Sequence, residues 1–162
     1  MTLIHAAHVA ATVVWLGGIL SLSLVVAPVL RRSLPPAQRI ALLTAIGRRF
    51  QPIGWASLGV LAVTGVWMAW PALREGVGIL GTPVGRLLLA KTALFAGIVA
   101  VGILHDRVLG PRLVQLAGRP EAFDEPPGQE LRAASRQLRM WGIVHLGLSL
   151  AAAGVGVWLA HG

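Results

Sequence analysis

Four long apolar stretches constrain the fold of this chain more than any other feature of its sequence. A helix needs about 20 residues to cross the roughly 30 Å hydrocarbon core of a bilayer. Hydrophobic residues make up 56% of the 162 residues and charged residues only 12%, which is far from the composition of a water-soluble domain. We therefore predict an all-α integral membrane protein, an antiparallel four-helix bundle in a single transmembrane domain over residues 1–162. The predicted spans are residues 3–30, 53–70, 86–109 and 140–160.

The basic residues predict the orientation of this bundle. Eleven arginines lie in or next to the first and third connections, residues 31–50 and 110–139, against Arg74 and Arg86 at the second connection. Because basic loops stay on the cytoplasmic side, we expect both connections to be cytoplasmic loops and both termini to lie outside. The expected location is a bacterial-type inner (plasma) membrane. Residues 37–50 have apolar residues at helical spacing, which predicts a short amphipathic helix at the interface.

The net charge of +8 follows from this topology, so a nucleic-acid partner is not expected. The lipid bilayer is the expected partner, and the arginines can also hold anionic lipid headgroups. The first apolar stretch has no basic segment before it, so we expect it to be kept as a span and not cleaved as a signal peptide.

Four of the five histidines lie inside or at the rim of these apolar stretches, where an ionisable residue is by default a candidate functional residue. The chain has no cysteine and three methionines, so histidine is nearly its only strong ligand for a transition metal or a haem iron. His5 and His8 lie near the outer end of the first span, with Lys91 at a similar depth in the third. His105 and His145 lie near the inner end, so that His105 is roughly 27 Å in depth from His8 at 1.5 Å per residue.

This depth estimate allows His105 and His145 to share one iron and excludes His8 and His105 from doing so. We predict His8, His105 and His145 as metal ligands. The remaining candidates for cofactor binding are His5, which is otherwise an interfacial ring, and Lys91, which pairs with a propionate or carboxylate or else extends to the interface. Asp106 could fix the tautomer of a neighbouring histidine. The many glycines of the spans either let helices pack closely or make room for a flat macrocycle.

Several motifs, taken in order, resemble the copper-resistance D (CopD) type of membrane protein. They are HVAATVVWLGG at 8–18, AP at 27–28, TG at 64–65, GRLLLAK at 85–91 and HDRVLGP at 105–111. The spacing of His8 to Trp15, and of Lys91 to His105, is also similar to HemJ, the membrane protoporphyrinogen oxidase. The resemblance implies copper handling on one side and haem or porphyrin redox chemistry on the other, with His8, Lys91 and His105 as its candidate residues.

The chain departs from both kinds of protein. It lacks the Cys and Met clusters that would give copper(I) soft ligands, and His145 stands where we expect an asparagine in HemJ. The added imidazole favours a haem b held by two histidines, so the main prediction is a haem-binding redox or electron-transfer protein. Such a protein could have a redox partner or a quinone as its electron donor or acceptor. It could also form a homo-oligomer with a second copy of the chain. The alternatives are copper transport, HemJ-like oxidation and a structural subunit, which leaves open whether the chain is an enzyme.

Overall fold

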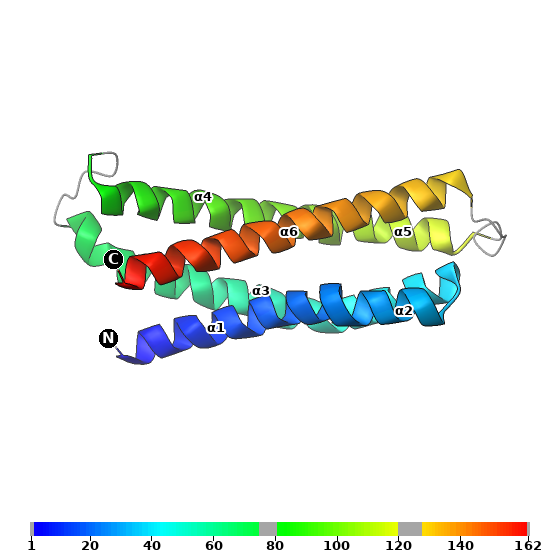
Figure 1. Cartoon of the computed structure of the whole chain (residues 1–162), viewed down its shortest axis with the longest axis horizontal. Coiled ribbons are helices and arrows are strands. Elements are labelled where there is room, and N and C mark those ends of the chain that lie inside the picture. The colour runs from blue at the N-terminus through cyan, green and yellow to red at the C-terminus, as the bar shows by residue number, and fades with distance from the viewer. Residues whose placement is uncertain (1, 75–80, 120–127, 162) are drawn as a thin grey trace.

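The computed structural model describes residues 2–74, 81–119 and 128–161, and these residues are almost entirely helical, with no strand among them. Four long helical rods run antiparallel, and both ends of the chain lie at the same end of the bundle (Figure 1). We call this end the terminal end and the opposite one the far end. The predicted all-α bundle of four membrane-spanning helices is confirmed.

Each rod is one helix or several helices in succession. The first consists of α1 (Thr2–Leu20), the π-helical turn η1 (Ser21–Val26) and α2 (Ala27–Ser33), and the second is α3 (Pro36–Arg74). The third consists of α4 (Pro83–Leu104), the π-helical turn η2 (His105–Leu109) and α5 (Gly110–Ala117), and the fourth is α6 (Gln129–His161). In the bundle, α1 packs mainly along α3, and α4 mainly along α6.

The outer surface of the bundle is apolar over most of its length. Val13, Val63 and Ile143 are each exposed over more than half of their surface, at 64%, 70% and 65%. Water-soluble monomers rarely expose apolar patches of this extent, whereas lipid tails are a suitable environment for them. All four rods are long and apolar enough to cross a membrane, so the chain is a multi-pass membrane protein.

The helices extend further than the sequence predicted. Residues 37–50, expected as a separate interfacial helix, are the first part of α3, which continues through Pro52. The third rod runs to Ala117 and α6 begins at Gln129, so the expected loops 31–50 and 110–139 are mostly helical where they are described. The reason lies in tertiary packing, since an amphipathic face covered by neighbouring helices need not lie on the membrane surface. The residues of that packing cluster are Ile40, Leu113, Leu116 and Leu131.

Each π-helical turn comes just before a proline near the start of the next helix, Pro28 in α2 and Pro111 in α5. Proline has no N–H and clashes with the carbonyl four residues earlier, and a wider turn lets the rod pass it without ending. At the end of η2, the Gly110 N–H donates to the His105 carbonyl oxygen. A Cβ on Gly110 would lie 3.1 Å from that oxygen, so glycine suits the position.

Aromatic rings packed against glycines hold the middle of the bundle together. Trp15 of α1 is buried and stacks on Phe50 of α3, with ring centroids 6.4 Å apart. A Cβ on Gly18 would overlap the Phe50 ring, and a Cβ on Gly54 would lie 2.9 Å from the Trp15 ring. These two glycines therefore serve close packing, one of the two roles that the sequence left open.

Two adjacent glycines provide a direct test of this packing. Gly18→Ala is expected to destabilise the protein by about 1–3 kcal/mol, because the Phe50 ring must move away from Trp15. Gly17→Ala is the matched control, since a Cβ on Gly17 meets nothing within 4 Å. We expect this control to leave stability unchanged or to raise it slightly, as alanine favours helix. Thermal unfolding of the two purified variants in detergent checks the prediction, and equal stabilities would contradict it.

Candidate functional site

The first polar contact inside the bundle joins His8 of α1 to Thr64 of α3 near the terminal end. His8 Nδ1 lies 2.7 Å from Thr64 Oγ1, and the Thr64 hydroxyl donates its proton to the Val60 carbonyl oxygen at 2.6 Å. Because a hydroxyl has only one proton to give, the His8 ring must donate its Nδ1–H to Thr64. The Nε2 atom of His8 then keeps its lone pair, which can bind a metal ion or accept a proton.

Lys91 of α4 and His5 of α1 belong to the same level of the bundle. Both are close enough to His8 to act on it electrostatically. The Lys91 side chain is partly buried, and its Nζ lies 3.4 Å from the position of a Cβ on Gly156 of α6. The structure thus places His8 and Lys91 at one depth, as the sequence indicated. We call His5, His8, Thr64 and Lys91 the terminal layer.

The second polar cluster surrounds His145, half-way along α6. Its ring packs on Trp15 with centroids 5.3 Å apart and an angle of 56° between the ring planes. His145 Cε1 also lies 3.8 Å from the position that a Cβ on Gly102 of α4 would take. Both His145 Nε2 and Trp15 Nε1 are buried and have no hydrogen-bond partner among the described residues. Because buried polar atoms are nearly always partnered, these two nitrogens require an explanation.

Asp106 of η2 is held in place by two donors from α3. Its Oδ2 accepts hydrogen bonds from Gln51 Nε2 and Trp55 Nε1, each at 2.8 Å. Sequence reasoning gave Asp106 the task of fixing a histidine tautomer, but its partners within the described part of the chain are an amide and an indole. These bonds instead tie the third rod to α3 and hold a carboxylate next to His105. We call Trp15, Trp55, His105, Asp106 and His145 the central layer.

The central layer lies near the middle of the helical bundle. The sequence places His105 and His145 near the inner rim of the membrane, since the third predicted span ends at 109 and the fourth begins at 140, and that depth in the membrane stays a prediction. The helices continue beyond both limits, so His145 is at the midpoint of α6. His105 and Asp106 are close enough to His145 to act on it electrostatically.

The five candidate residues of the sequence therefore fall into two sets, His5, His8 and Lys91 in one and His105 and His145 in the other. Trp15 follows His8 by seven residues on the first rod and His105 follows Lys91 by fourteen on the third, which separates the layers by roughly 10–20 Å. This is less than the depth of roughly 27 Å between His8 and His105 that the sequence predicted. Within residues 2–74, 81–119 and 128–161, no three or more His, Cys, Asp or Glu side chains form a group that could hold a metal ion. An ion at either layer would rely on one or two imidazoles and on smaller ligands.

Sequence reasoning counted Met68 only as one of three scattered methionines, and it missed the aromatic partner of His145. Met68 is partly buried on α3, one turn from Thr64 towards the terminal end, and residues four apart lie on the same helix face. That spacing was the available signal for a thioether on the helix face that carries Thr64. No comparable signal existed for the contact of Trp15 with His145, because it depends on how two distant helices are rotated against each other.

Comparison with known proteins gives a family and a curated relative. The family described as Copper resistance protein D matches residues 44–159, a range that includes Lys91, His105 and His145 but neither His5 nor His8. The chain is also similar to a protein of Bacillus subtilis (strain 168) named Copper transport protein CutJ, with 29% identity over 98 residues. These residues are 60% of this chain but only 17% of that relative. No solved structure matches, and neither finding bears on the similarity to HemJ.

Proposed function

The chain belongs to the copper resistance protein D family, and on this premise we propose that it binds copper ions within the membrane and passes them along its bundle. One observation carries the proposal, the buried Nε2 of His145 that has no hydrogen-bond partner among the described residues. An unpartnered buried nitrogen costs about 1–3 kcal/mol. A site that keeps such a nitrogen is explained if a ligand fills the position during function.

The chemistry of the central layer suits copper. Imidazole nitrogens bind copper well, and copper(II) is the tightest-bound of the common divalent first-row metals. His145 offers Nε2, and His105 supplies a second imidazole close by. The Asp106 carboxylate, fixed by Trp55 and Gln51, offsets the positive charge of an ion that has lost its water.

The terminal layer provides a point of entry. His8 presents Nε2 because Thr64 holds its Nδ1–H, and His5 precedes it by one helical turn. Met68 adds a thioether, the soft kind of ligand that copper(I) prefers, on the face of α3 that carries Thr64. Since the layers are roughly 10–20 Å apart in depth, one ion cannot bind both at once and would move from the terminal to the central layer.

Haem binding, the main prediction from the sequence, has less support. The space beside three glycines of the bundle is filled by aromatic rings, Phe50 at Gly18, Trp15 at Gly54 and Trp55 at Gly102. A macrocycle between His105 and His145 would have to displace rings of this cluster. The copper alternative needs no such rearrangement and agrees with the family match and with the name of the relative.

Copper retention by the purified full chain tests the proposal. The metal-free protein is first loaded with copper and then dialysed. We expect it to retain copper, as measured by elemental analysis, and to show no Soret band. Thr64→Val, which removes the partner that fixes the His8 tautomer, should weaken copper binding at the terminal layer about 10- to 100-fold. Thr64→Ser keeps the hydroxyl and is the matched control. A pyridine haemochrome signal in a protein that retains no copper would contradict the proposal.

A further inference from the structure

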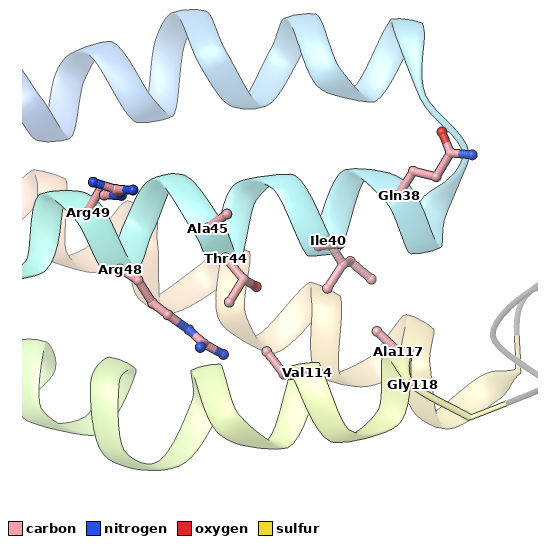
Figure 2. A pocket seen from close by; sticks show the side chains of 10 residues that line it. Gln38, Ile40, Thr44, Ala45, Arg48, Arg49, Val114, Ala117 and Gly118 are labelled. Atoms are coloured by element: carbon pink, nitrogen blue, oxygen red, sulfur yellow. The ribbon is translucent and has the colours of Figure 1, made fainter.

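An open cavity of about 830 Å³ lies between α3 and α5 near the far end of the bundle (Figure 2). It is separate from both histidine layers. One face of α3 lines it, because Gln38, Ala41, Ala45 and Arg48 recur at the spacing of three or four residues that brings side chains onto one helix face. The remaining lining residues are Ile40, Thr44, Arg49, Val114, Ala117 and Gly118.

Arg48 is the cation directed into this cavity. Its side chain extends from α3 towards α5, whereas Arg49 points to the other side of α3 (Figure 2). No carboxylate lines the cavity, and the ion pair found within the described residues is Arg119 with Glu130. Arg48 therefore has no anionic partner there. A guanidinium pairs well with phosphate through two parallel hydrogen bonds.

The walls around Arg48 are largely apolar. Ala41 and Ala45 form the α3 side, Val114 and Ala117 form the α5 side, and Ile40 is only 4% exposed. A free phosphate ion would leave this surface in contact with water, whereas a phospholipid combines an anionic headgroup with acyl chains that bury apolar surface. The adjoining α2 also changes here from apolar residues to arginines in its last turn, as expected at a membrane boundary.

We propose that this cavity binds an anionic phospholipid, with its phosphate at Arg48 and an acyl chain along the alanine and valine walls. The lipid would fill the space between α3 and α5 and place a negative charge beside Arg48, which has no carboxylate among the residues that line the cavity with it. The proposal is independent of copper binding, because none of the cavity residues belongs to either histidine layer.

Native mass spectrometry of the detergent-solubilised full chain tests the proposal. The probes are phosphatidylglycerol and phosphatidylcholine with identical acyl chains, and inorganic phosphate as a competitor. We expect the protein to bind phosphatidylglycerol preferentially, and Arg48→Gln to weaken that binding at least about tenfold, the loss expected for a hydrogen bond to a charged group. Arg32→Gln removes an equal charge from the exposed last turn of α2 and should weaken it at most about threefold.

A second variant tests the apolar part of the cavity without changing its charge. Ala45→Trp would occupy the space that an acyl chain needs, and should also weaken phosphatidylglycerol binding about tenfold or more. Thermal unfolding shows whether each variant is folded. Equal binding of the two lipids would overturn the proposal, because the net negative charge of the headgroup would then contribute nothing. Equal losses in Arg48→Gln and Arg32→Gln would overturn it in favour of diffuse attraction of anionic lipid to the arginines. Displacement of the lipid by inorganic phosphate at equal concentration would overturn it in favour of a soluble anion.

Discussion

His145→Phe is expected to abolish copper binding at the central layer and at the same time to stabilise the metal-free protein. The two effects have one cause. The variant removes a buried ring nitrogen that has no hydrogen-bond partner among the described residues, and so removes a penalty of about 1–3 kcal/mol. Phenylalanine keeps an aromatic ring next to Trp15, but it has no lone pair for a metal ion. A residue that lowers stability in exchange for ligand binding is typical of a functional site.

Two measurements on the purified protein check this prediction, the copper retained after dialysis and the thermal unfolding temperature without copper. Ser149→Ala is the control, because Ser149 is buried one turn further along α6 and its hydroxyl already donates to the His145 carbonyl oxygen. We expect this variant to bind copper as the unaltered chain does. A His145→Phe protein that is less stable would show that His145 has a structural role, and one that retains full copper binding would exclude His145 as a ligand.

Asp106→Ala is expected to be the most destabilising of the substitutions considered, by about 2–3 kcal/mol. It leaves the Trp55 indole and the Gln51 amide without their shared acceptor, and hydrogen bonds to a charged group contribute about 1.5–3 kcal/mol. It also disconnects η2 from α3 next to His105. Copper binding at the central layer should be lost as well, because the carboxylate charge and the geometry disappear together.

Asp106→Asn separates the contribution of the charge from that of the geometry. The asparagine oxygen can still accept from Trp55 and Gln51, so most of the stability should remain, as measured by thermal unfolding. The negative charge is gone, so copper affinity, measured by competition with a chelator, should fall about tenfold or more. An Asp106→Asn protein with unchanged copper affinity would show that Asp106 acts only by holding η2 against α3.

The grouping of the candidate residues was predictable because it depends on residue type and on position along each helix. The pairing of His105 with His145, and of His8 with Lys91, followed from counting residues along helices of known rise. The hydrogen bonds of Asp106 did not follow, because Gln51 and Trp55 come from a helix that the sequence placed in two separate parts. The sequence also could not predict that His145 Nε2 is buried without a hydrogen-bond partner among the described residues. This property depends on which polar groups the neighbouring helices place beside the ring.

The sequence by itself determined the class of this protein and the length of its apolar spans. Long apolar runs form helices in a membrane because each backbone hydrogen bond is made within the same segment, so the information is local. The tertiary structure decided how far these helices extend, which histidines face which aromatic rings, and where the cavity at Arg48 opens. These properties depend on the rotation and register of one helix against another, which side chains distant in the sequence fix jointly.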